Sequence, residues 1–448
     1  MQVAKSKGRQ SKVLSHGPYC CLSKNSTFKL IIFTMSFLIL LCFYSMGIYE
    51  ISNARNPILN SGDDYLLGVC VALLLHLAIE FIPISSKLKP TLHLIWFGRT
   101  LFALFFGIFY ESNYIFLDAF TYFESAIIDP VSIDKISFAG TSNILVFSSF
   151  FVNANIVSYH AIKIIFAFLG FLGLVGYYLT WETITGRKSA QCLLIFGLFP
   201  SFAFWSSIYG KDSIVVFTLG FYFLFFSKCL VSKRSQFWKF FLFSILFLIG
   251  ASMVRSWLFW IFGPLSFLSI IKTKAKTSWF TCSMILLPTT PILTYFIFSP
   301  DLNSLLERIN TISRSWAIGG SGQIPPTFHS ISDILLFLPL GMFTALFRPQ
   351  LTDINNMFSL FAAIENVILI IGIFIAFSKR LNNDYNLIFF RRIFINFLIL
   401  WSMVYSFISY QNLGAASRFR CQITGLLLIV ITLSSSFVRK PAPLVSNE

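Results

Sequence analysis

The chain has few charged residues for its length. Lys, Arg, Asp and Glu make up 12% of its 448 residues, whereas about a quarter of the residues in a soluble protein are charged. Apolar residues make up 56%, with 55 phenylalanines among them, and the mean hydropathy is +0.76. This composition excludes a soluble globular domain and predicts an all-α polytopic membrane protein.

Patterns that hold metals, nucleotides or disulfides are also scarce. The eight cysteines are scattered, mostly inside apolar runs, so we expect neither a zinc site nor disulfides. The five histidines offer no metal pair, although His160 and Lys163 are spaced to share a helix face. No P-loop, G-x-G-x-x-G or Ser-His-Asp pattern is present, which argues against nucleotide-driven transport. We expect no cofactor and no metal.

Basic residues outnumber acidic ones by 34 to 18, which gives a net charge of +16. This excess does not indicate nucleic-acid binding, because it lies in short loops between apolar runs, where Lys and Arg orient membrane helices. Residues 1–27 form a basic segment before the first apolar run. That run is too long for a cleavable signal and lacks an Ala-x-Ala-like site. We therefore predict a signal anchor behind a cytoplasmic tail.

Twelve apolar runs approach the length of about 20 residues that a bilayer crossing needs. The charge bias predicts that both ends of the chain are cytoplasmic, with a single membrane domain over 28–438 and a second tail over 439–448. The predicted spans are 28–49, 64–84, 93–111, 158–180, 191–208, 213–231, 239–255, 257–272, 279–298, 357–378, 392–410 and 419–438.

Two long segments, 112–157 and 299–356, are predicted to lie on the outer side of the membrane. The first mixes aromatic, aliphatic and acidic residues. Its apolar residues recur at near-helical spacing, which predicts an amphipathic helix in the membrane interface. The residues concerned are Phe116, Phe120, Phe123 and Ile127.

The second outer segment is expected to begin as a flexible loop over 299–331, because it contains a Gly-rich run and a Pro-Pro pair. Residues 332–347 are apolar, but they are interrupted by Pro339 and Gly341. If they crossed the membrane, the basic cluster after the next span would face outward. We expect a re-entrant or interfacial hairpin on the outer side, where it lines a cavity or packs on protein.

The strongly charged residues inside or beside the apolar runs fall on this outer side. Each such charge costs about 2.5–3.5 kcal/mol near hydrocarbon, so charges kept there often mark a functional site. Lysine and arginine on the outer side also run against the orientation rule. The residues concerned are Asp118, Glu124, Lys211, Asp212, Arg255, Arg314, Arg348, Arg418 and Arg420.

Two carboxylates are candidates for a catalytic base. Asp118 follows the third span, with Tyr122 one helical turn later and Glu124 beyond it. A carboxylate at the membrane boundary can accept a proton from a sugar hydroxyl. Asp118 could equally be an interfacial acid that ends the span. The second candidate is Glu365, about two turns into the tenth span.

The densest motif is FPSFAFWSSIYGKD, in which Pro200 breaks the fifth span and Lys211 and Asp212 occupy a short turn. Anion binding explains a lysine there better than orientation does, although an ion pair at a hairpin tip is the alternative. Other outer turns carry RSW, LFRP and NLGAASRFR. An arginine fork grips phosphate oxygens through two hydrogen bonds, although each arginine could instead snorkel or cap a helix. The candidates for substrate binding are therefore Tyr122, Glu124, Trp205, Lys211, Asp212, Arg255, Trp257, Trp316, Arg348, Asn412, Arg418 and Arg420.

These motifs resemble those of bacterial polytopic GT-C-like glycosyltransferases and of O-antigen or capsule polysaccharide polymerases, over about residues 115–425. The resemblance implies a multi-pass protein of the bacterial inner membrane that works in surface polysaccharide biosynthesis. Its substrates would be polyprenyl-(pyro)phosphate-linked saccharides at the periplasmic face. Asp118 matches the position of the acid that is the general base in GT-C enzymes. The chain departs from the family pattern because it has no DxD or paired-acid motif there, which puts metal dependence in doubt.

The expected mechanism uses cations for the phosphate and a carboxylate for the proton. Asp118, or otherwise Glu365, deprotonates the acceptor hydroxyl, while tryptophans 205, 257 and 316 stack on sugar faces. The (pyro)phosphate is held, and its developing charge stabilised, by Lys211, Arg255, Arg348, Arg418 and Arg420.

A lipid-linked oligosaccharide flippase or other transporter is the alternative function. Transporters usually carry internal repeats and charges at the bilayer midplane. This chain has no detectable repeat, and its charges gather at one face, which favours the enzyme. The expected partners are the lipid-linked saccharide, the bilayer and other polysaccharide-assembly membrane proteins, with no nucleic acid.

Overall fold

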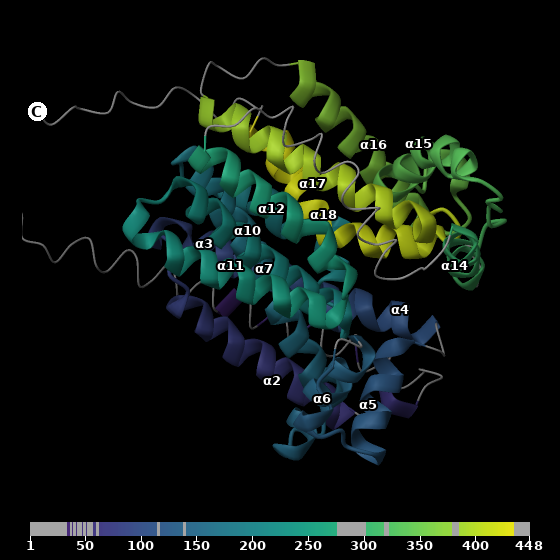
Figure 1. Cartoon of the computed structure of the whole chain (residues 1–448). Coiled ribbons are helices and arrows are strands. Elements are labelled where there is room, and N and C mark those ends of the chain that lie inside the picture. Colours follow the sequence, from purple (N-terminus) through teal and green to yellow (C-terminus); the bar gives the residue numbers. More distant parts are fainter. Residues whose placement is uncertain are drawn as a thin grey trace, which may run out of the picture.

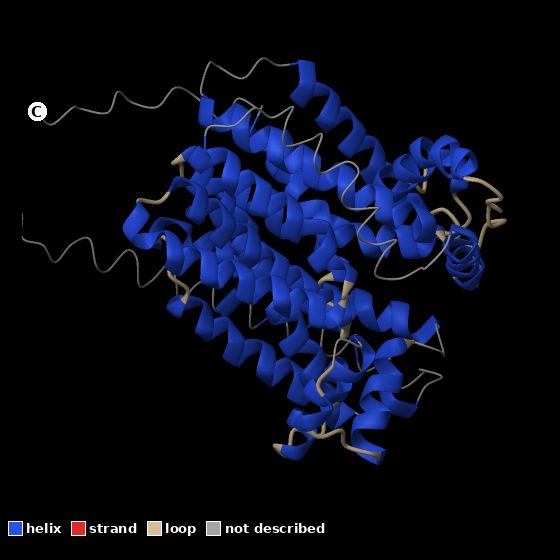
Figure 2. Ribbon diagram, in the orientation of Figure 1, coloured by secondary structure: helices blue, strands red, loops and turns tan. Residues whose placement is uncertain are grey.

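The described residues form helices joined by short connections (Figure 1). Figure 2 shows helix and loop, and no strand, in this part of the chain. The predicted tails, most of the first span and the ninth span lie outside it. The computed structural model describes a few single positions between 34 and 51 and residues 57–59, 62–113, 117–137, 140–275, 302–317, 322–378 and 385–433.

Eight helical stretches in these ranges are long and apolar enough to cross a membrane, so the chain is a helical membrane protein. One stretch consists of two helices joined by a π-helical turn at Phe102–Phe106. The helices are α2 (Gly62–Ala78), α3 with α4 (Lys89–Leu101 and Gly107–Asn113), α7 (Tyr159–Thr185), α10 (Lys211–Val231), α11 (Arg234–Val254), α16 (Met357–Ser378), α17 (Tyr385–Ser409) and α18 (Leu413–Leu433).

These eight stretches coincide with eight of the twelve predicted spans, and the predicted span 257–272 is a shorter apolar helix, α12 (Trp257–Ala275). The predicted span 191–208 is not a single helix. It is divided into α8 (Ala190–Leu198) and α9 (Pro200–Trp205). The predicted count of twelve is therefore not confirmed.

The break between α8 and α9 has a local cause. Pro200 has no amide hydrogen to donate to the preceding turn, and its ring disfavours helical geometry at the residue before it. Phe199 accordingly has an extended backbone, with φ −60° and ψ 118°. Neither short helix alone reaches the length of a membrane span.

The centre of the bundle is formed by α7, α10 and α18 (Figure 1). Of the residues in the apolar part of α18, 89% are buried inside the protein, against 28% for α11 and for α16. The latter two helices therefore form part of the periphery. The backbones of α7 and α10 approach closely. A Cβ atom on Gly173 would lie 2.4 Å from the Val216 carbonyl oxygen. Small residues at such contacts are typical of packed membrane helices.

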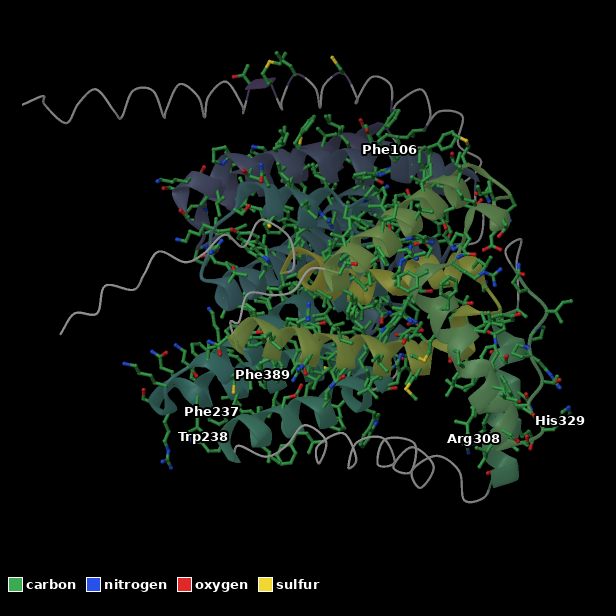
Figure 3. All side chains as sticks on the ribbon, turned by 90° about the horizontal axis from the view of Figure 1, so that it is seen from above. Phe106, Phe237, Trp238, Arg308, His329 and Phe389 are labelled. Carbon is green, nitrogen blue, oxygen red and sulfur yellow. The ribbon has the colours of Figure 1, made fainter. Side chains whose placement is uncertain are left out.

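Four further helices gather at the end of the bundle where α10 begins (Figure 1). Arg308 and His329 lie at this end, whereas Phe237 and Trp238 lie at the opposite one (Figure 3). The four helices are α5 (Asp118–Ile128), α6 (Gly140–Asn153), α14 (Leu302–Ser315) and α15 (Ile331–Phe347).

A helix is present in the segment 112–157, as its spacing predicts. Phe120 and Phe123 are buried on α5, and Ile127 is exposed. Phe116 lies outside the described residues. Thus α5 packs its two aromatic residues against the protein and leaves one aliphatic residue on its surface.

The segment 299–331 is not a loop throughout, because α14 occupies part of it. Leu306 and Ser313 are buried two turns apart, whereas Glu307 and Arg308 on the same helix are exposed. This alternation makes a helix with one buried face. Its polar residues keep its hydropathy low, so a search for apolar runs does not find it.

Residues 332–347 form one helix that continues through Pro339, so the expected hairpin is not seen. The Phe337 ring lies 5.2 Å from the Tyr410 ring, and the Arg348 guanidinium lies 6.0 Å from the same ring. Phe337 in the middle of α15 and Arg348 just after it therefore both lie against Tyr410, which follows the last residue of α17. This places α15 across the end of α17.

Candidate functional site

Charged side chains from four elements meet at the end of the bundle where α10 begins. The Asp212 carboxylate accepts hydrogen bonds from Arg255 Nη2 at 2.9 Å and from Arg418 Nε at 2.5 Å. Arg418 Nη1 also donates to Asp118 Oδ2 at 3.2 Å. Lys211 lies close enough for its charge to interact with the other four. These five residues are called the Asp212 cluster below.

Local sequence explains why Asp212 and Arg255 carry opposite charges here. Asp212 is in the first turn of α10, where the free backbone N–H groups favour an anion. Arg255 follows the last residue of α11, where the free carbonyl groups favour a cation. Both side chains are buried, with Asp212 only 4% exposed. Two helix ends thus present complementary charges to each other.

A glycine allows the turn that starts α10. Gly210 has φ +153° and ψ −163°, a conformation that only glycine adopts readily. Lys211 follows, and its ammonium group donates to the Thr141 hydroxyl of α6 at 2.8 Å. The three successive residues therefore have separate roles. Gly210 allows the turn, Lys211 contacts α6, and Asp212 places a carboxylate inside the protein.

Two of the three predicted tryptophans adjoin the Asp212 cluster through aromatic contacts. The Arg255 guanidinium lies 4.5 Å from the centre of the Phe419 ring, and Trp316 packs against the same ring at 5.2 Å. Trp257 lies 6.0 Å from Arg255 and donates to the Tyr405 hydroxyl at 2.8 Å.

Other candidates lie at different distances from these charges. Trp205 packs instead against Tyr110, with the ring centres 6.0 Å apart. Asn412 caps the start of α18 by accepting a hydrogen bond from the Ala415 backbone at 2.9 Å. Glu124 is exposed on α5. Trp205 and Asn412 thus have structural contacts of their own, and Glu124 lies on the surface of α5.

Tyr122 is a buried hydroxyl beside this cluster. Burial raises the pKa of Tyr122 above its usual range, and the nearby Asp118 carboxylate raises it further. The hydroxyl therefore stays protonated at neutral pH. A protonated hydroxyl can donate a hydrogen bond to an anionic or sugar oxygen, but it cannot serve as a base there.

Arg420 and Glu365 form a separate buried pair, with Arg420 Nη2 3.6 Å from Glu365 Oε1. Glu365 also accepts hydrogen bonds from the Ser201 backbone at 2.6 Å and from the Ser201 hydroxyl. Arg420 Nη1 donates to the carbonyl oxygens of Leu346 and Arg348, both at 3.3 Å. This pair connects the start of α9 to α15, α16 and α18.

Arg348 is paired with a different acid. Its Nε donates to Asp353 Oδ2 at 2.9 Å, and its Nη2 donates to Asp353 Oδ1 at 2.6 Å. The two-bonded fork that a phosphate would use is thus occupied by a carboxylate. This hydrogen bonding holds the pKa of Asp353 below its usual range.

The cations predicted to line one cavity therefore occupy three places. Lys211, Arg255 and Arg418 are together, whereas Arg348 and Arg420 each contact their own acid. Two acidic candidates, Asp118 and Asp212, form ion pairs with Arg418 of the first group.

Comparison with known proteins does not supply a function for this chain. No protein-family model, curated protein or solved structure matches it. Its chemistry must be argued from its own side chains.

Metal-ligating residues do not gather in the described ranges. No three His, Cys, Asp or Glu side chains come together there in a way that could hold a metal ion. Two histidines do meet between α2 and α3, where His93 Nδ1 lies 3.0 Å from His76 Nε2. His93 Nε2 lies 2.9 Å from Glu80 Oε1.

Three further charged residues are buried. The sequence patterns do not point to Arg99 or Glu111, and they give Lys163 no ion-pair partner. Glu111 accepts hydrogen bonds from Lys163 at 2.7 Å and from the Tyr159 hydroxyl at 2.8 Å. Arg99 is fully buried and donates to the carbonyl and hydroxyl oxygens of Ser206 at 2.9 and 2.7 Å. Both Arg99 and Glu111 lie in the predicted span 93–111. The cost of a charge in an apolar run could have identified them.

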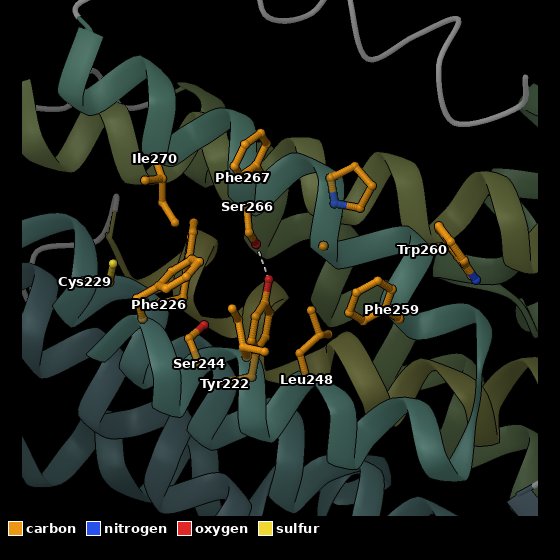
Figure 4. Close-up of a pocket in the computed structure, with 14 residues that line it drawn as sticks. Tyr222, Phe226, Cys229, Ser244, Leu248, Phe259, Trp260, Ser266, Phe267 and Ile270 are labelled. Atoms are coloured by element: carbon orange, nitrogen blue, oxygen red, sulfur yellow. Dashed lines mark hydrogen bonds between the residues drawn. The ribbon is translucent and has the colours of Figure 1, made fainter. Parts of the chain in front are cut away.

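An apolar cavity of about 320 Å³ lies between α10, α11 and α12 (Figure 4). Its lining includes Phe226, Leu248 and Phe267, and none of its lining residues is charged. The Tyr222 and Ser266 hydroxyls hydrogen-bond to each other within it (Figure 4). It is therefore distinct from the Asp212 cluster.

Proposed function

We propose that this protein is a membrane glycosyltransferase or polysaccharide polymerase. Its substrates would be polyprenyl-(pyro)phosphate-linked saccharides at the periplasmic face of a bacterial inner membrane. The observation that supports this most is the Asp212 cluster. Two arginines and a lysine from three elements meet there beside a mostly exposed carboxylate, Asp118, whose side chain is 57% exposed.

The reaction needs a cation for the leaving group and a base for the acceptor. The acceptor hydroxyl oxygen would bond to the anomeric carbon while the bond from that carbon to the phosphate oxygen breaks. The phosphate leaves with the electron pair, and Arg418 and Lys211 stabilise its charge. Asp118 takes the hydroxyl proton, because it is the accessible carboxylate of the cluster.

Asp118 is a better candidate for the base than Glu365. The Glu365 side chain is 4% exposed, and both of its oxygens already accept hydrogen bonds from Ser201. A base must come within hydrogen-bond reach of the substrate proton. Glu365 could meet that need only after α9 moves, whereas Asp118 already faces solvent.

The test is product formation by the purified protein from a synthetic polyprenyl-pyrophosphate-linked saccharide, followed by mass spectrometry. Arg418→Gln and Asp118→Asn should lose most product. Arg308→Gln, at an exposed arginine of α14, is the matched control and should keep it (Figure 3). A chelator should leave the wild-type rate unchanged. Translocation of the donor without a new glycosidic bond would identify a flippase and refute the transferase.

A further inference from the structure

We propose that the Asp118 carboxylate occupies the position of an anionic ligand group, and that a phosphate displaces it from Arg418 on binding. This inference rests on the proposed function, because it concerns how the same site receives a phosphate-bearing donor. It adds an order of events. The ligand first takes the Arg418 Nη1 donor, and Asp118 then becomes free to act as a base.

The two acids bound to Arg418 differ in how easily they can be exchanged. Asp212 is buried and also bound to Arg255, so its removal would leave the buried Arg255 guanidinium without its ion-pair partner. The Asp118 side chain is 57% exposed and makes a single bond of 3.2 Å to Arg418. Exposed ion pairs of this kind contribute little to stability. Asp118 is the exchangeable partner of the two.

Charge balance favours the same exchange. The three cations and two carboxylates of the Asp212 cluster leave a net charge of +1, which is weak for binding a pyrophosphate. Without Asp118 at Arg418, the remaining groups carry +2. A phosphate oxygen accepts from a guanidinium as a carboxylate oxygen does, so it can replace Asp118 without moving Arg418.

The exchange also changes what Asp118 can do. While Arg418 Nη1 donates to Asp118 Oδ2, that carboxylate oxygen is occupied. Once the phosphate takes Arg418, the oxygen is free to accept a hydrogen bond from the acceptor hydroxyl. Donor binding would therefore free the base that receives the acceptor proton.

The test titrates inorganic pyrophosphate into the purified full-length protein in nanodiscs and measures its affinity. Asp118→Asn should bind it about two- to fivefold more tightly than wild type, the change expected when a competing exposed ion pair is removed. Asp129→Asn, at the end of the same helix and with the same change in net charge, should bind it as wild type does. Arg418→Gln should bind it at least tenfold more weakly.

A second arm uses farnesyl pyrophosphate, which separates a lipid-borne phosphate from a free one. The same order of affinities among the variants is expected for both probes. Unchanged or weaker binding by Asp118→Asn would overturn the inference, as would an equal gain in Asp129→Asn. Asp118→Ala provides a second variant, and size-exclusion chromatography checks that each protein is folded.

The result separates this inference from the proposed function. If the affinities follow the expected order but no saccharide product forms, the transferase proposal is refuted and the exchange at Arg418 is supported. If product forms while Asp118→Asn binds pyrophosphate no more tightly than wild type, the proposed exchange is refuted and the transferase proposal is supported. Absence of binding to either probe in wild type and Asp118→Asn would also overturn the exchange.

Discussion

Replacing Asp212 with asparagine should destabilise the folded protein strongly, because it removes one partner of a buried ion pair. Arg255 is 5% exposed, and Asp212 is its only ion-pair partner among the described residues. Loss of one member of such a pair costs about 3–5 kcal/mol, since the other charge stays buried without compensation. The contact of Arg255 with Phe419 is made in the wild type as well as in the variant, so it does not offset that loss.

The free energy of unfolding can be measured by denaturant titration in mixed micelles, with tryptophan fluorescence as the signal. Asp118→Asn is the control, because its side chain is mostly exposed and its pair with Arg418 should contribute at most about 1 kcal/mol. The double variant Asp212→Asn with Arg255→Met should lose less than the sum of the two single changes, because neither charge is then left alone. If Asp212→Asn were no less stable than Asp118→Asn, the argument from burial would be wrong.

Three further outcomes follow from the geometry of single residues. Gly210→Ala should cost about 1–3 kcal/mol of unfolding free energy, because φ is +153° there; Gly62→Ala, in open space, should not be destabilising. Arg418→Lys should lose most product in the saccharide assay at normal protein level, since lysine lacks the planar fork that lets Nε hold Asp212 while Nη1 is offered to a phosphate. Arg348 holds the pKa of Asp353 below its usual 3.8. This pair therefore stabilises the fold above pH 3.8 and loses its effect as the pH falls below that value. The difference in melting temperature between wild type and Asp353→Asn should accordingly shrink below pH 3.8.

The sequence predicts the long helices well, because a membrane span is a local property of about 20 successive residues. It fails where a short-range signal interrupts that pattern. The apolar run 191–208 predicts one span, but Pro200 divides it into two short helices. Conversely, Pro339 predicts a break in its segment, but α15 continues through it. The effect of a proline depends on whether neighbouring helices hold the segment together, which the sequence does not show.

The sequence predicts which charged residues belong to the site, but not which of them pair with one another. The cost of charge near hydrocarbon identified every member of the Asp212 cluster. It could not show that Arg348 binds Asp353 or that Arg420 binds Glu365. Asp353 is five residues from its partner in the chain, but the other pair joins two helices, and such contacts depend on tertiary packing. Counting cations therefore overestimates how many are free to hold a ligand.

The burial of Asp212 depends in part on Arg99, a residue that is far from it in the sequence. After α9 ends, the backbone from Ser206 to Gly210 is not helical, although it is buried, and buried carbonyl groups need donors. Arg99 supplies one donor to the Ser206 carbonyl at 2.9 Å. The Ser213 hydroxyl has one hydrogen, which is shared between the carbonyls of Ser206 at 3.0 Å and Ile208 at 2.7 Å.

These bonds explain why α10 can begin inside the protein rather than at its surface. A cation near the last carbonyls of α9 is also favoured by the direction of the helix dipole. A Cβ atom on Gly170 would lie 1.9 Å from the Ser206 carbonyl oxygen, so α7 has a glycine where the turn packs against it. The buried position of Asp212 thus follows from the broken helix before it. That break is tolerated because Arg99, Gly170 and Ser213 accommodate the non-helical backbone.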